Sequence, residues 1–352
     1  MHRSFPGTLL LKFNLCFFAA LWVNTLASQP YYFNHYQVED GLSNNTVFCS
    51  IQDKLGFIWF GTRDGLNRFD GYTFKIFSNL NDENILESNF IRALKEDTHG
   101  TIWVGTDQGL FIFDPLKENF HLFQEDITGE ILDIQIDRAG RVWFISDLVL
   151  YRFSPASGSL KRISGDFLVS AFLLPKEGNL TWVATANGQM LLYGNDDEIK
   201  GTYSVFEKSS SSIDKWIETL SETQVGELLV GTRKQGIKLF NSEKKEYRDL
   251  LKHDSKNETI FVRDIVWVKD DEYWFATESG IIIYKLETNQ HRYLTKENNN
   301  PWALSDNAVY TLLKDSEGAI WAGTYFGGIN YYSPRNGLFE KFYPLNGQNS
   351  IS

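Results

Sequence analysis

The sequence is poor in cysteine. Cys16 and Cys49 are its only two thiols in 352 residues. Cys16 lies in an N-terminal segment that we expect to be removed, so Cys49 would remain alone and no disulfide could form within the mature chain. The fold must then depend on its apolar core. With 42% apolar and 15% aromatic residues, the chain has enough material for a large one.

Basic residues are outnumbered by acidic ones. The chain has 34 lysines and arginines against 45 aspartates and glutamates, which gives a formal net charge of −11. Binding to nucleic acid requires a clustered basic face to neutralise phosphates. The composition therefore argues against nucleic acid as a direct partner.

Histidine is scarce and scattered. The six histidines share neither a repeat position nor the spacing of metal ligands, and they are His2, His35, His99, His121, His253 and His291. We therefore expect no metal site and no cofactor. We also predict no catalytic residues.

Long apolar runs are missing too. The longest candidate, from Phe13 to Val23, has 11 residues, whereas a membrane span needs about 20. Basic residues precede this run, and small residues at Thr25 and Ala27 follow it. This pattern predicts a secretory signal peptide over residues 1–27. A membrane anchor is the competing interpretation.

What the chain does contain is a repeat. The phrase "IWFGTRDGL" returns as "IWVGTDQGL", "VWFISDLVL", "TWVATANGQ", "LLVGTRKQG", "YWFATESGI" and "IWAGTYFGG". The tryptophan position recurs every 39 to 47 residues, at Trp59, Trp103, Trp143, Trp182, Leu229, Trp274 and Trp321. This period is that of a four-stranded blade, so the sequence predicts an all-β protein, a seven-bladed β-propeller with antiparallel blades.

The first copy divides into strands at residues 47–53, 57–62, 66–70 and 74–78, from the innermost to the outermost. The seventh copy repeats this order and would take residues 339–343 as its outer strand. Residues 31–40 read as a spare outer strand. It could close the ring, or the seventh blade could simply meet the first. We place the propeller at residues 28–343 and treat 344–352 as the start of a missing further repeat or a tail.

Three copies resemble the two-component regulator propeller repeat. They are "VFCSIQDKLGFIWFGTRDGLNRFDG", "IRALKEDTHGTIWVGTDQGLFIFD" and "VYTLLKDSEGAIWAGTYFGGINYYS", and four further copies match it in part. The resemblance implies the periplasmic N-terminal sensor propeller of a hybrid two-component histidine kinase. Such receptors typically sense oligosaccharides and regulate polysaccharide utilisation. The chain resembles only the first propeller of such a receptor, so neither the kinase activity nor the membrane-spanning part is carried over to it.

Strand polarity places candidate ligand contacts on one face. The turns after the second strand and the connections into each innermost strand should emerge together around the channel. Aromatic and planar hydrogen-bonding side chains in these loops could hold a sugar, and the candidates are Asn45, Arg63, Arg233, Arg263, Trp302, Asn307 and Tyr325. Ordinary solvated loop residues are the alternative, and Trp302 could instead pack beside its blade.

Two other functions stay open at this stage. A secreted propeller enzyme acting on glycans, a lyase or a glycosidase, could use paired loop acids such as Asp64, Asp107 and Glu278. Alternatively, the propeller could be a scaffold that docks a second propeller, a receptor domain or its own copy. Propellers host many functions, and the repeat alone does not choose between them.

Overall fold

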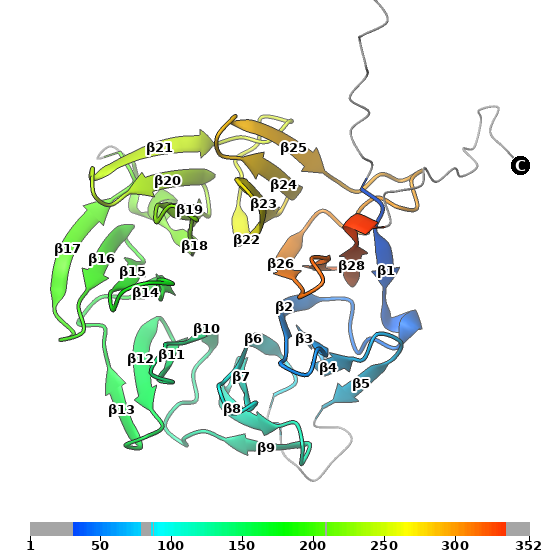
Figure 1. Cartoon of the computed structure of the whole chain (residues 1–352), viewed down its shortest axis with the longest axis horizontal. Helices are drawn as coiled ribbons and strands as arrows, with labels where there is room; N and C mark the ends of the chain where they lie inside the picture. The colour runs from blue at the N-terminus through cyan, green and yellow to red at the C-terminus, as the bar shows by residue number, and fades with distance from the viewer. Residues whose placement is uncertain (1–30, 79–85, 87, 208–209, 336–352) are drawn as a thin grey trace, which may run out of the picture.

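The computed structural model shows seven four-stranded antiparallel sheets around a central channel (Figure 1). It describes residues 31–78, 86, 88–207 and 210–335. Within these residues, helix is limited to short 3-10 turns: η1 (Val38–Asp40), η2 (Ser212–Lys215) and residues 334–335, where the described part of the chain ends. The predicted seven-bladed β-propeller is confirmed. The predicted signal peptide and the segment 344–352 lie outside the described residues.

Each blade is a meander whose strands run outward from the channel. The innermost strands are β2 (Val47–Gln52), β6 (Ile91–Glu96), β10 (Ile131–Ile136), β14 (Val169–Leu173), β18 (Ile217–Glu222), β22 (Val262–Lys269) and β26 (Val309–Lys314). The second strands, which carry the tryptophan motif, are β3 (Ile58–Thr62), β7 (Ile102–Thr106), β11 (Val142–Ser146), β15 (Thr181–Thr185), β19 (Leu228–Thr232), β23 (Glu272–Thr277) and β27 (Ile320–Thr324).

The third strands are β4 (Gly65–Phe69), β8 (Gly109–Asp114), β12 (Val149–Ser154), β16 (Gln189–Tyr193), β20 (Ile237–Asn241), β24 (Gly280–Lys285) and β28 (Ile329–Tyr332). The outer strands are β1 (Asn34–Tyr36), β5 (Phe74–Phe77), β9 (Asn119–Leu122), β13 (Ser159–Arg162), β17 (Ile199–Ser204), β21 (Glu246–Leu251) and β25 (Gln290–Leu294).

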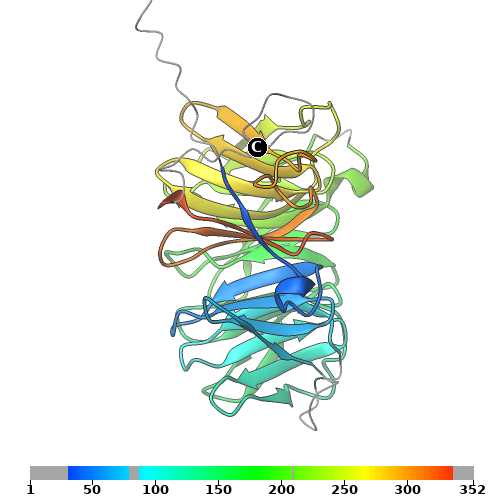
Figure 2. The same cartoon turned by 90° about the vertical axis from the view of Figure 1, so that its right-hand side faces the viewer.

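The N-terminal strand closes the ring. β1 pairs antiparallel with β28 and so supplies the outer strand of the seventh blade, as Figure 2 shows for the blue segment beside the red one. Tyr36 then packs on Phe69 of the first blade, at 5.2 Å between ring centroids, and on Trp321 of the seventh, at 6.1 Å. Of the two ways of closing the ring, the spare strand is the correct one.

One strand prediction is wrong in consequence. Residues 339–343 were expected to form the outer strand of the seventh blade, but β1 occupies that position. Residues 339–343 themselves lie outside the described part of the chain. The physical reason is that a sheet edge has one free ladder of hydrogen-bonding groups, and the N-terminal strand takes it.

The repeated tryptophans lie in the core between blades, as their apolar character predicts. Trp59 is fully buried, and its indole N–H donates to Asp53 Oδ2 at 2.7 Å. The same bond, from a tryptophan to the aspartate six residues before it, recurs at Trp103, Trp143 and Trp321. The motif is therefore a packing unit, and it holds the turn between the first two strands against the core.

The glycine of the motif permits close approach of the next blade. A Cβ on Gly61 would lie 2.6 Å from a side-chain carbon of Ile91, the first residue of the neighbouring innermost strand. Gly323 meets Val47 of the first blade in the same way, at 2.7 Å. In the blades that have it, the glycine of the "W-x-G-T" phrase thus allows the next blade to pack closely.

Candidate functional site

The central channel opens on the face predicted from strand polarity. A cavity of about 630 Å³ is lined by all seven innermost strands. It also includes Trp216 and Arg233, which belong to loops of this face. We call this face the mouth face. The opposite face carries the turns between the first two strands.

A β-bulge near the start of every innermost strand builds the mouth. In all seven blades the register shifts between the first and third residues of the strand. A bulge leaves its extra residue out of the ladder and re-aims the side chain. The seven residues at this position all line the cavity, and we call them the bulge ring: Phe48, Arg92, Leu132, Ser170, Glu218, Arg263 and Tyr310.

Arg263 has the most extensive contacts in the bulge ring. Its guanidinium donates to Glu278 Oε1, at 2.8 Å from Nε, to Glu218 at 3.3 Å and to the hydroxyl of Tyr310 at 3.2 Å. The group also lies 3.8 Å from the ring centroid of Phe261 and 4.3 Å from that of Tyr310. Hydrogen bonds and aromatic stacking thus fix its plane at the mouth.

A second arginine shares the same carboxylate. Arg233 donates to Glu218 Oε2 at 2.9 Å and lies 4.4 Å over the indole of Trp216. Glu218 therefore joins Arg233 and Arg263 across two neighbouring blades. This network holds donors and acceptors together at one side of the mouth.

Aromatic side chains also line the bulge ring. Tyr310 stacks on Tyr325 at 5.4 Å with an interplanar angle of 23°, and it meets the edge of Phe48 at 5.4 Å. Arg92 lies 5.7 Å over Phe48 and forms an ion pair with Glu130. Burial raises the pKa of Tyr310, so its phenol stays protonated and able to donate at neutral pH.

Three of the seven predicted candidates come together. Arg233, Arg263 and Tyr325 come together at the mouth, as described above. Arg63 is exposed in the corresponding turn of the first blade. Sequence reasoning missed Phe48, Arg92, Glu218 and Tyr310, although a signal for them exists: the bulge residue and the turn residue of one blade are 15 positions apart, as in Glu218–Arg233, Arg263–Glu278 and Tyr310–Tyr325.

The two candidate asparagines shape loops. Asn45 Oδ1 accepts from the backbone N–H of Val38 at 3.0 Å, and Asn307 Oδ1 accepts from that of Lys296 at 2.7 Å. The backbone carbonyl of Asn307 also accepts from Gly280. Both side-chain oxygens are therefore engaged in holding the connections that surround the mouth.

Trp302 packs against the N-terminal segment. Its ring packs edge-on against Tyr32 at 6.2 Å, and its carbonyl accepts from the backbone N–H of Phe33. It is absent from the lining of the central cavity. The closing N-terminal segment thus provides Trp302 with an apolar partner beside its blade.

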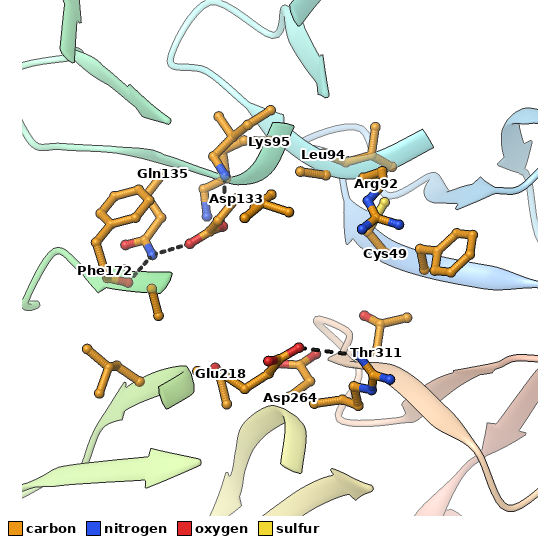
Figure 3. A pocket seen from close by; sticks show the side chains of 18 of the residues that line it. Cys49, Arg92, Leu94, Lys95, Asp133, Gln135, Phe172, Glu218, Asp264 and Thr311 are labelled. Atoms are coloured by element: carbon orange, nitrogen blue, oxygen red, sulfur yellow. Dashed lines mark hydrogen bonds and ion pairs between the residues drawn. The ribbon is translucent and has the colours of Figure 1, made fainter. Parts of the chain in front are cut away.

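The channel below the mouth carries polar side chains that tie blades together (Figure 3). Asp264 Oδ2 accepts from the N–H of Leu312 in the next blade at 2.8 Å, and Gln135 bonds the carbonyl of Phe172 at 2.9 Å. Asp133 lies on the wall opposite Asp264. Burial raises the pKa of both carboxyls. Asp264 and Gln135 thus have partners across a blade boundary, whereas Asp133 accepts from Ile134 and Gln135 of its own strand.

The described residues form neither a metal-binding cluster nor a membrane-spanning helix. No group of three or more His, Cys, Asp or Glu side chains there is placed to hold a metal ion. No helix in the same part of the chain is long and apolar enough to cross a membrane.

Comparison with known proteins assigns the repeat. The family described as "Two component regulator propeller" matches residues 41–64, 85–108 and 303–326. Each match starts before an innermost strand and ends in the turn after the second strand, so it contains both mouth loops and the bulge of its blade. Histidine kinase P4 of Formosa agariphila is 44% identical over 68 residues, which is 19% of this chain and 5% of that protein.

Solved structures share the whole ring. The extracellular domain assigned to a hybrid two component system of B. thetaiotaomicron superposes with a TM-score of 0.72 at 25% identity, covering 86% of this chain and 42% of that one. A streptogramin B lyase shares the fold alone, with a TM-score of 0.65 at 14% identity over 86% of this chain and 97% of the lyase. The chain thus spans less than half of the extracellular domain that it matches.

Fold and mouth together define a seven-bladed propeller with a cavity at one end of its channel. More specifically, three of its repeats match the two-component regulator propeller family, and the ring is similar to the extracellular domain of a hybrid two component system.

Proposed function

We propose that this chain is the periplasmic ligand-sensing propeller of a hybrid two-component receptor, and that it binds an oligosaccharide at the bulge ring. The observation that carries the proposal is the network of Arg233, Glu218, Arg263 and Tyr310 at the mouth of a regulator-repeat propeller. Sugars offer hydroxyl groups that both donate and accept, together with apolar C–H faces. The network supplies planar donors, carboxylate acceptors and aromatic faces within one cavity.

The charge balance favours a ligand with little net charge. The three arginines that line the cavity are all ion-paired. Arg92 pairs with Glu130, and Arg233 pairs with Glu218. Arg263 pairs with both Glu218 and Glu278. A phosphate or sulfate would have to compete with these carboxylates for the guanidinium groups. A neutral polyol can instead bond to both partners of a pair without separating them.

The closed ring suggests how such a signal would travel. Hydrogen bonds in the channel join neighbouring blades, as between Asp264 and Leu312 and between Ser50 and Thr311 at 3.2 Å. We therefore expect a ligand to change the backbone within the propeller very little. Signalling would come from the propeller shifting against partner domains, because a ligand shifts an equilibrium only by its differential affinity for two states.

Thermal unfolding with a panel of host and plant oligosaccharides at millimolar concentration tests the proposal. A ligand at 100 times its dissociation constant stabilises the folded state by about 2.7 kcal/mol. We expect a raised melting temperature for one glycan class, with the glycan recovered intact by chromatography. Cleavage of the glycan would point to an enzyme instead. No shift with any member would contradict glycan binding by this chain and favour a docking scaffold.

A further inference from the structure

A second hollow adjoins the central cavity on the mouth face. It has a volume of about 560 Å³ and lies between loops of the fourth and fifth blades. Phe167 and Leu168 come from the connection into β14, Asn187 from the turn after β15, and Lys234 from the turn after β19. We call this hollow the side groove.

The side groove and the central cavity share a boundary. Trp216 and Arg233 contribute to the lining of both. The guanidinium of Arg233 lies over the indole and is bonded to Glu218, so this boundary is fixed in place. A chain-like ligand that leaves the bulge ring across Trp216 would enter the side groove directly.

The side groove exposes apolar surface that the fold does not cover. Leu168 is 53% exposed, although its carbonyl is bonded to the N–H of Ala186 at 2.8 Å and the next residue, Val169, is bonded to Leu148. Phe167 and Trp216 beside it are half-buried. Exposed apolar side chains that gather beside a cavity mark binding surfaces more often than isolated ones do.

We propose that the side groove is a second subsite, which binds further sugar units of the same oligosaccharide whose first units occupy the bulge ring. This inference rests on the proposed function and adds that the ligand is an extended chain. Leu168, Phe167 and Trp216 would pack against the apolar faces of these units. Lys234 and Asn187, both exposed at the rim, would bond their hydroxyl groups.

Chain-length series separate the two subsites. Calorimetric titrations would use cello-, malto- and xylo-oligosaccharides of two to six units with the wild-type protein and with Leu168→Asp. We expect affinity of the wild type to rise with chain length. The substitution should remove that gain and weaken the longest ligand about tenfold, the value expected when one leucine loses its apolar contact. Binding of the shortest ligand should stay unchanged. Leu116→Asp, at a position 90% exposed in the turn after β8, is the matched control. It should change the affinity for neither the shortest nor the longest ligand.

Each outcome has a distinct meaning. If short and long ligands bind the wild type equally well, or if Leu168→Asp weakens both alike, the side groove is not a separate subsite and the inference is overturned, while binding at the mouth stands. If Arg263→Gln leaves binding of the shortest ligand unchanged, the proposed mouth site fails instead. If none of the three series binds the wild type, both proposals are contradicted for these glycans.

Discussion

Replacing Asp53 with alanine should destabilise the first blade strongly. The carboxylate makes three hydrogen bonds: Oδ1 accepts from the backbone N–H groups of Leu55 at 3.0 Å and Phe57 at 2.9 Å, and Oδ2 accepts from the indole of Trp59 at 2.7 Å. Asp53 is buried and Trp59 has no exposed surface. Water therefore cannot replace the lost partner of the indole.

The size of the effect follows from these contacts. A buried donor left without a partner costs about 1–3 kcal/mol. The two turn N–H groups lie nearer to solvent, and we assign them about 0.5 kcal/mol each because water can take over part of their bonding. The sum is roughly 2–4 kcal/mol. At an unfolding entropy of about 2.1 cal/mol/K per residue, a domain of roughly 300 residues loses about 1.6 °C per kcal/mol, so the melting temperature should fall by roughly 3–6 °C.

A double-mutant cycle isolates the indole bond. Asp53→Ala, Trp59→Phe and the double variant would be unfolded in urea, and the coupling between the two positions should be about 1–3 kcal/mol. Asp70→Ala is the control, because Asp70 accepts similar turn bonds from Tyr72 and Thr73 but lies at the surface. Coupling near zero, or a loss no larger than in the control, would refute this account of the motif.

Three further predictions concern other parts of the chain. Burial raises the pKa of the Cys49 thiol to about 12. In a Cys16→Ser protein, Cys49 should therefore resist alkylation by iodoacetamide at pH 8 until the protein unfolds. Rapid labelling of the folded protein would contradict this. Burial also raises the pKa of Asp264, so the carboxyl supports folding below its ordinary pKa of about 4 and this support is lost as pH rises through the folded value. Asp264→Asn should thus gain stability relative to wild type on going from pH 4 to 7, and a constant difference in urea unfolding would argue against it. Tyr36→Ala should cost about 2 kcal/mol by opening the ring closure, measured against Tyr72→Ala at a position 92% exposed, and equal losses would count against the closure.

The blades could be predicted because one phrase carries their spacing. Trp59 and its counterparts set the phase, and the structure places the strands of the first blade within one residue of the predicted bounds at either end. The drifted fifth blade is instructive. It has Thr223 where the aspartate belongs and Leu229 in place of tryptophan. The carboxylate acceptor and the indole donor are therefore absent together, and this blade buries no indole N–H without its partner. The Thr223 hydroxyl accepts from the backbone N–H of Glu227 instead.

The mouth could be predicted only in part, because loop position does not determine where a side chain points. Arg263 and Tyr325 could be chosen from strand polarity, but Glu218 and Tyr310 are turned into the cavity by bulges, whose mark in the sequence is only a position 15 residues before the turn residue. Trp302 had the sequence context of a rim aromatic. Its partner Tyr32 belongs to the other end of the chain, which only the closed ring brings close.

The central claim is that ligand binds at the bulge ring on the mouth face. Calorimetric titration of the panel glycan that most raises the melting temperature tests it most directly, with wild-type protein, Arg263→Gln and Arg141→Gln. Arg141 is ion-paired to Asp137 in the turn between β10 and β11, on the opposite face. The account predicts that Arg263→Gln weakens binding at least tenfold and that Arg141→Gln leaves it unchanged. Equal binding by all three proteins would contradict it.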